Sequence, residues 1–448
     1  MTDRTLSRRR FLGGAAAAAG GAAVSPWLAG CSVDSGGGAK AATTLTVMLE
    51  PSELPADVIS GFEKENPDIA VKLVKHDPTR LTAMLAAGDP PDVARETATF
   101  SSYLAVRGLA AEIDPYLQKS SVIKESDLAG INDLWRFDGT AQGQGPRYGL
   151  TIDYSQDAML WANTKLFEQA KVPVPPDTEP LAYENLIDLA RKLTRKTSDK
   201  KTAVFGYGGT VDFDMAQLAH MVSAQSGRLF NDDYTRVDFS SPEARKTLQF
   251  WIDLARAGVS YGPTRPNPAG WDGTTYKAGR IALYTAGYWY QQAMADVPDL
   301  RKASRFLPAP TFAGNRISPC YYGTGVWIPA KAKNKDAAWR FIEYYVGGAA
   351  GKRRAAEGRG LPSLKSLEGE LPKNTPEAKQ SYDTQRRELE HYSAVVVNTP
   401  YLRSESLKKV LQAEFKSAVS NDTAAGKVAD SLNDQVNELI DQERDKVK

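Results

Sequence analysis

Apolar residues recur between residues 44 and 94 with two different periods. One period is two residues, which places apolar side chains on one face of a strand, and the other is near 3.6 residues, which marks one face of a helix. The pattern predicts strands over Thr44–Leu49, Ile69–Val74 and Asp92–Ala94, and helices over Pro55–Asn66 and Thr79–Ala87. We expect Thr79 to cap the second helix and Gly88 to end it. Strands that alternate with helices in this way favour a mainly parallel sheet covered by helices.

The same two periods continue through the rest of the chain, and its C-terminal part is mostly helical. Further strands are predicted over Tyr148–Tyr154, Met159–Asn163, Val204–Tyr207, Ile281–Tyr284 and Gly325–Pro329. Further helices are predicted over Lys165–Ala170, Tyr183–Leu193, Met215–Gln225, Pro242–Ala257 and Lys335–Tyr345. A chain of 448 residues is too long for one compact core, so we expect two α/β lobes.

The N-terminal segment has the features of an export signal rather than of a folded element. Ser7–Leu12 carries a twin arginine before an apolar pair, and a Gly/Ala-rich run and then Leu28–Cys31 follow. The twin-arginine motif resembles the signature of Tat export, and Leu28–Cys31 resembles a bacterial lipobox in which Cys31 is lipidated. We therefore expect residues 1–30 to be a signal peptide and residues 31–43 to be a flexible tether.

Composition excludes several classes of function. The formal net charge of +2 supplies no basic field for nucleic acid. The three histidines, His76, His220 and His391, are scattered, and no metal-binding spacing surrounds them. Once Cys31 is lipidated only Cys320 remains, which excludes an internal disulfide and is typical of a packed apolar residue. We expect no metal and no cofactor.

Six short segments, in order, carry a resemblance to a known family. They are Phe62–Pro67 after the first strand, Gly88–Val93, Leu160–Phe167, Ala286–Trp289, Gly323–Pro329 and Gly358–Ser363. Behind a lipobox, this order resembles the family 1 extracellular solute-binding proteins of ABC sugar importers, maltose-binding-protein-like lipoproteins. The resemblance implies a carbohydrate ligand in a cleft between two lobes joined by three crossings, and membrane permease subunits of the importer as partners.

The resemblance also implies a division of the chain into lobes. The N-terminal lobe is expected to comprise residues 44–152 and 324–362, and the C-terminal lobe residues 153–323 and 363–448. We expect a monomer, held by its lipid at the extracellular face of the cell membrane, with no enzymatic activity.

A sugar site needs aromatic faces for C–H surfaces and planar polar groups for hydroxyls. In open α/β sheets such groups gather in loops at the carboxyl ends of strands. Residues of these types in such loops are the predicted ligand contacts: Glu50, Arg95, Glu96, Asp153, Tyr154, Asp214, Trp271, Tyr288, Trp289, Tyr322 and Arg359. The remaining tryptophans are expected in the core: Trp135, Trp161, Trp251, Trp327 and Trp339.

Two other interpretations stay open at this point. An exported glycosidase would place two carboxylates across the cleft, and Glu50 and Asp153 are the pair that the sequence offers. A receptor for another solute, such as a peptide, a polyamine or a phosphorylated polyol, would share the fold. Aromatic-rich loops favour a neutral sugar, although Arg95 and Arg359 leave an acidic sugar open.

Overall fold

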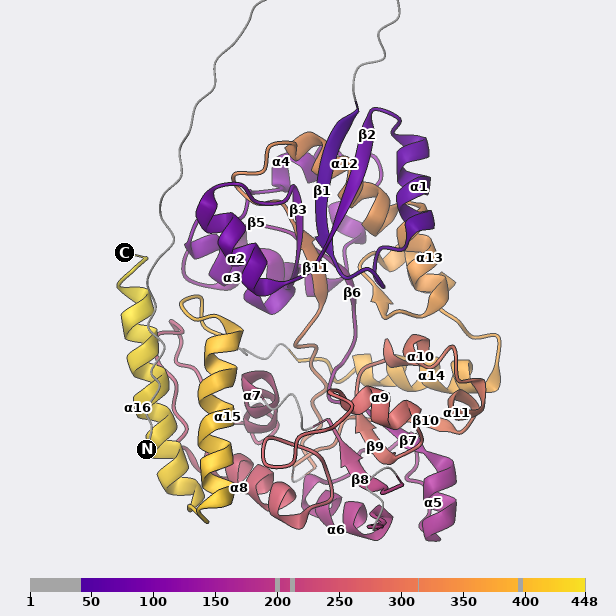
Figure 1. Cartoon of the computed structure of the whole chain (residues 1–448), viewed down its shortest axis with the longest axis vertical. Helices are drawn as coiled ribbons and strands as arrows, with labels where there is room; N and C mark the ends of the chain where they lie inside the picture. Colours follow the sequence, from indigo (N-terminus) through magenta and orange to yellow (C-terminus); the bar gives the residue numbers. More distant parts are fainter. Residues whose placement is uncertain (1–41, 198–201, 210–213, 313, 394–397, 448) are drawn as a thin grey trace, which may run out of the picture. The chain divides into compact units, whose positions relative to one another are not determined.

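The computed structural model describes residues 42–197, 202–209, 214–312, 314–393 and 398–447 (Figure 1). The predicted signal peptide, most of the tether and Cys31 lie outside these ranges. Within them, no helix combines the length and the apolar character that crossing a membrane requires. The described residues from 42 onward form one compact unit built on two sheets.

The first sheet has six strands in the described residues. In spatial order they are β12 (Leu361–Pro362), β6 (Leu150–Tyr154), β11 (Thr324–Trp327), β3 (Val93–Thr97), β1 (Thr43–Leu49) and β2 (Ile69–Lys75). The strand β1 pairs in parallel with β2 and β3, whereas β11 lies antiparallel between β3 and β6. A separate hairpin joins β4 (Arg136–Phe137) and β5 (Gln142–Arg147).

Apolar side chains cover both faces of this sheet. The helices around it are α1 (Ala56–Glu65), α2 (Pro78–Ala87), α3 (Ser101–Val106), α4 (Asp114–Leu117), α12 (Lys335–Ile342) and α13 (Ala349–Glu357). Short 3₁₀ turns occur at Ala98–Phe100, Glu125–Asp127, Gly130–Trp135 and Lys365–Glu370, and a π turn at Glu343–Gly347. Trp135 packs so closely on the sheet that a Cβ at Gly325 would lie 2.3 Å from its ring. Glycine is therefore needed at this position for packing.

The start of α2 corrects one prediction. Asp77, not Thr79, is the N-cap, and its carboxylate accepts a hydrogen bond of 2.9 Å from the N–H of Arg80. Pro78 takes the first helical position, where its missing N–H costs nothing and its fixed φ suits the helix, so the cap must precede it. Gly88 ends the helix at φ 74°, as predicted.

The second sheet has the order β10 (Ser304–Leu307), β7 (Leu160–Asn163), β9 (Ile281–Thr285) and β8 (Phe205–Gly208). Its core continues into the helices between β7 and β10 and into those at the C-terminal end of the chain. These helices are α5 (Thr164–Ala170), α6 (Tyr183–Leu193), α7 (Met215–Ser223), α8 (Pro242–Ala257), α9 (Asp272–Lys277), α10 (Tyr290–Ala293), α11 (Pro298–Lys302), α14 (Pro376–Leu389), α15 (Ser404–Ser420) and α16 (Ala425–Arg444). The tryptophans predicted for the core are buried: Trp135, Trp161, Trp251, Trp327 and Trp339.

Both sheets are mixed, which differs from the mainly parallel sheets that the sequence pattern predicts. In the second sheet β7 is antiparallel to both of its neighbours, and only β8 and β9 run parallel. The reason is that the chain passes between the sheets three times: after β6, after β10 and after β12. Parallel neighbouring strands are usually joined by a helical crossover. The strand β11 instead enters its sheet directly from the other sheet, so it can pair antiparallel.

Candidate functional site

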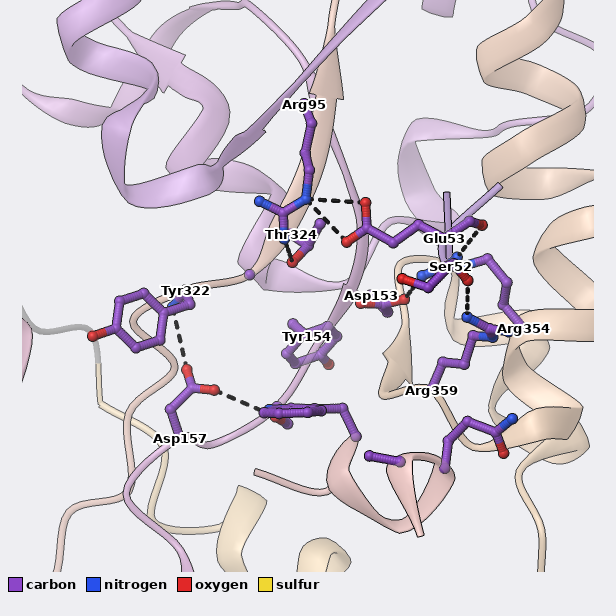
Figure 2. Close-up of a pocket in the computed structure, with 15 residues that line it drawn as sticks. Ser52, Glu53, Arg95, Asp153, Tyr154, Asp157, Tyr322, Thr324, Arg354 and Arg359 are labelled. Atoms are coloured by element: carbon purple, nitrogen blue, oxygen red, sulfur yellow. Dashed lines mark hydrogen bonds and ion pairs between the residues drawn. The ribbon is translucent and has the colours of Figure 1, made fainter. Parts of the chain in front are cut away.

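A cavity of about 540 Å³ is lined by residues of both sheets' elements and of the crossing segments after β6 and after β10 (Figure 2). We call it the main cavity. The elements of the first sheet contribute Ser52, Glu53, Arg95, Asp153, Thr324, Arg354 and Arg359. The crossing segments and the elements of the second sheet contribute Ser155, Asp157, Trp289, Gln292, Ala293 and Tyr322. One wall is therefore rich in charged groups, and the other is partly aromatic.

The charged wall is built from ion pairs within the chain. Arg95 on β3 donates from Nε to both carboxylate oxygens of Glu53, at 2.9 and 3.0 Å, and from Nη2 to the Thr324 hydroxyl at 3.3 Å. Arg359 donates to the Glu357 carboxylate at 2.6 Å and to the Ser52 carbonyl at 2.8 Å. Each of these guanidinium groups already has a carboxylate partner.

The third ion pair is the most buried one. Arg354 on α13 contacts the Asp153 carboxylate at the end of β6, with only 10% and 14% of the two side chains exposed. The same guanidinium donates to the Tyr345 hydroxyl at 2.9 Å and to the Glu53 carbonyl at 3.1 Å. Burial by itself lowers the pKa of Arg354, but Asp153, Tyr345 and Glu53 together raise that pKa above its ordinary value. Burial also raises the pKa of the Asp153 carboxyl although Arg354 lowers it, so the charged guanidinium is the counter-charge on which the Asp153 carboxylate depends.

The aromatic wall is fixed from behind by Tyr290. Its fully buried ring makes edge contacts with Trp289 at 5.5 Å and with Trp271 at 6.0 Å between centroids, and its hydroxyl donates to the Gly273 carbonyl. Trp271 and Trp289 stack with centroids 6.2 Å apart and ring planes within 13°. Because the two indoles hold each other in place, Trp289 presents a preset apolar face to the cavity.

Tyr322 forms the rest of this wall. Its hydroxyl donates to the carboxylate of Asp214, which also caps α7 by accepting from the N–H of Ala216. The backbone N–H groups of Tyr321 and Tyr322 donate to Asp157 at 2.9 and 3.2 Å. Asp157 lies in the crossing after β6, and the two tyrosines lie in the crossing before β11, so this carboxylate joins two crossing segments.

A second, smaller cavity of about 230 Å³ adjoins the main one, and we call it the side chamber. The two cavities share Asp157, Trp289 and Tyr322. The side chamber alone is lined by Gly209, Gln217, Trp271, Asp272, Tyr284 and Thr285, among others. Gly209 and Thr285 lie at the carboxyl ends of the parallel strands β8 and β9, where ligands sit in open α/β sheets.

The structure brings most of the predicted site residues together. Six of them line the main cavity: Arg95, Asp153, Tyr154, Trp289, Tyr322 and Arg359. Trp271 lines the side chamber, and Asp214 supports Tyr322 from behind. Ligand contact by any of them stays a prediction.

Three predicted residues lie elsewhere, each for a local reason. Glu50 falls in the turn after β1, and Glu53, three residues later, takes the place on the cavity wall. Glu96 follows Arg95 on β3, so it points to the opposite face, where burial raises the pKa of its carboxyl. Tyr288 is fully buried in the second core, with Phe306 at 6.3 Å.

Glu53, Asp157 and Arg354 are the charged groups of the main cavity that the sequence interpretation missed. Arg354 stands in the run Lys352-Arg353-Arg354, which has the pattern of a solvated helix face. Only its neighbours in space single it out, because Arg353 pairs with exposed Asp57 whereas Arg354 turns inward. Asp157 has a weak signal, since it lies just beyond a predicted strand end.

Residues 46–352 match the family model described as bacterial extracellular solute-binding protein. The chain belongs to this family. Among the relatives of this solute-binding protein is a binding protein of Brucella abortus, 26% identical over 358 residues that cover 76% of this chain and 77% of the relative. The mannitol-binding protein of Pseudomonas aeruginosa is 24% identical over 306 residues, 65% of either chain.

Among solved structures, the fold matches an ABC substrate-binding protein of Listeria monocytogenes in complex with cycloalternan. The TM-score is 0.74 at 21% sequence identity, over 89% of this chain and 98% of that one. This confirms the predicted two-sheet α/β fold of periplasmic-binding-protein type. Membership of the family also identifies the molecule as an extracellular receptor for a solute rather than an enzyme.

Asp157 predicts a pH dependence for the stability of this solute-binding protein. Burial raises the pKa of its carboxyl from 3.8 to about 7, although the N–H groups of Tyr321 and Tyr322 favour the carboxylate. The folded protein thus holds the proton more tightly than the unfolded chain. The raised pKa of Asp157 therefore adds to the free energy of unfolding below pH 3.8, and this contribution is lost as the pH rises through about 7.

The variant Asp157→Asn removes this titration. Urea unfolding at several pH values should show a smaller decrease in the free energy of unfolding towards higher pH than in the unsubstituted protein. Asp188→Asn, on the exposed face of α6, is the matched control and should leave the decrease unchanged. Equal pH profiles for the protein and the Asp157→Asn variant would contradict the assignment.

Proposed function

We propose that this protein captures a neutral carbohydrate or polyol in the main cavity and delivers it to an ABC importer. The observation that carries the proposal is the pairing of walls: the Trp289 face lies across one cavity from the Arg95–Glu53 and Arg354–Asp153 pairs. A sugar ring has apolar C–H faces and hydroxyls at its rim, and these two walls match them.

The ion pairs support a neutral ligand over an acidic one. Arg95, Arg354 and Arg359 each bind a carboxylate of the chain, so no described guanidinium in the cavity lacks a counter-charge. An anionic ligand at Arg95 or Arg354 would have to displace Glu53 or Asp153, and the displaced carboxylate would lose its counter-charge in a largely buried place. Hydroxyl groups, by contrast, can donate to the carboxylates and accept from the guanidinium groups without breaking a pair.

The ligands named for two similar proteins also support a neutral, hydroxyl-rich solute. One is named for mannitol and another was solved with cycloalternan, and both ligands are rich in hydroxyl groups. These names do not decide the length of the ligand, since one is a linear polyol and the other a cyclic oligosaccharide.

The proposal also includes export of the protein and its attachment to the membrane by a lipid on Cys31. The twin arginine at Arg8-Arg9 and the Leu28–Cys31 motif support export through the Tat route and lipidation of Cys31. A lipid would hold the receptor next to the membrane permease subunits that accept its ligand. Metabolic labelling with palmitate tests this step: label should enter the protein and be absent from Cys31→Ser.

The ligand is tested by isothermal titration of the purified protein with mannitol, monosaccharides and oligosaccharides, and with uronic acids as charged counterparts. We expect binding of a neutral compound with a change in tryptophan fluorescence, because Trp289 lies in the cavity wall. Preference for a uronic acid would contradict the neutral site. The absence of binding and of thermal stabilisation with every compound would contradict the function.

A further inference from the structure

We propose that the ligand site continues past Trp289 into the side chamber, so that the solute is an oligosaccharide of at least two rings. This inference rests on the proposed function and specifies its substrate class. Its first support is that the two cavities adjoin and share part of their lining. Asp157, Trp289 and Tyr322 line both of them, so a ligand that contacts these three side chains lies at the boundary of the two spaces.

The next support is an unpaired acceptor in the side chamber. Gln217 on α7 donates from Nε2 to the Gly209 carbonyl at 2.9 Å, which fixes the plane of its amide. Its Oε1 is buried and has no hydrogen-bond partner among the residues that the structure describes. Buried acceptors in folded proteins are nearly always paired. A ligand hydroxyl in the side chamber would supply the missing donor.

The other polar groups of the side chamber are already held in place. The carboxylate of Asp272 accepts from the Gly209 N–H and from the Asn267 amide, both at 2.7 Å. The hydroxyls of Thr285 and Tyr207 share a hydrogen bond of 2.7 Å. The chamber is therefore preorganised, which lowers the entropy lost when a ligand binds.

The third support is the aromatic surface that joins the two cavities. Trp289 lines both, Trp271 lines only the side chamber, and their rings are nearly parallel. One sugar ring against Trp289 would leave Trp271 and the Gln217 oxygen without a contact. Two linked rings can use the ion pairs of the main cavity and the amide of the side chamber together.

The test compares affinities along two homologous series, glucose to maltotriose and mannose to mannotriose, by isothermal titration. In the series that binds, we expect the disaccharide to bind at least about tenfold more tightly than the monosaccharide. Gln217→Ala should reduce disaccharide affinity about five- to tenfold more than monosaccharide affinity, since only the longer ligand reaches the amide. Gln249→Ala, the same change at an exposed position of α8, should alter neither.

Trp271→Phe serves as another variant: it keeps an aromatic ring beside Trp289 but reduces the aromatic surface of the side chamber, and it should show the same selective loss, so the test does not depend on one substitution. The side chamber has no role in binding if the monosaccharide and the disaccharide bind equally well and both variants weaken the two ligands equally. The proposed function would then still stand. If no member of either series binds while mannitol or another neutral monosaccharide does, this inference fails and the proposed function stands. If no compound of the whole panel binds, both fail.

Discussion

Replacing Trp289 by alanine is expected to weaken carbohydrate binding by at least about thirtyfold, which corresponds to about 2 kcal/mol. Trp289 and Tyr322 both line the two cavities, and Trp289 presents the larger aromatic surface and is fixed from behind by Tyr290. Truncation removes the surface on which a sugar ring stacks and leaves water in its place. The same change should abolish most of the fluorescence response to the ligand.

Two further variants sharpen this prediction. Trp289→Phe keeps an aromatic face and should retain most of the affinity, which separates stacking from a general loss of structure. Tyr392→Ala removes an aromatic side chain that is 37% exposed and lines neither cavity, and it should bind normally. If Trp289→Ala stays within about threefold of the unsubstituted protein, the ligand does not stack on this wall.

Replacing Arg354 by methionine is expected to reduce the free energy of unfolding by about 3–5 kcal/mol, because it leaves the Asp153 carboxylate buried without a counter-charge. The substitution also removes the donors to the Tyr345 hydroxyl and the Glu53 carbonyl. Urea unfolding monitored by circular dichroism measures the loss.

The double variant Asp153→Asn with Arg354→Met should recover much of the lost stability, since neither buried group then carries a charge. Arg386→Met is the matched control: Arg386 pairs with Glu368 at the surface, with its side chain 50% exposed, so its loss should cost less than about 1 kcal/mol. A double variant no more stable than Arg354→Met alone would show that the charge of Asp153 is not the cause.

Several elements were predictable because their signals are local. The helix predicted over Pro242–Ala257 has the same bounds in the structure, since Ser241 caps it, Pro242 opens it and Gly258 ends it in the left-handed region. Arg95, Asp153 and Trp289 were predictable as cavity residues because they lie at or near strand ends, where an α/β sheet exposes its ligand groups.

Other features depend on contacts between distant parts of the chain. The antiparallel insertion of β11 between β3 and β6 joins segments more than a hundred residues apart, and no local pattern encodes it. The same holds for Arg354, which a local pattern cannot distinguish from Arg353 beside it. Glu53 rather than Glu50 reaches the cavity, because the turn after β1 places it next to Arg95 on β3. The sequence does not show the shape of this turn or the position of Arg95.

The sequence alone therefore determined the kind of molecule: many of its helices and strands, its family and the loops from which a binding site is made. These follow from periodicity, capping and short motifs, which act over a few residues. Only the tertiary structure decided which face each loop residue takes, which charges cancel one another, and that a second chamber opens beyond Trp289. These depend on strand register and on long-range packing, where a shift of one residue moves a side chain to the opposite face.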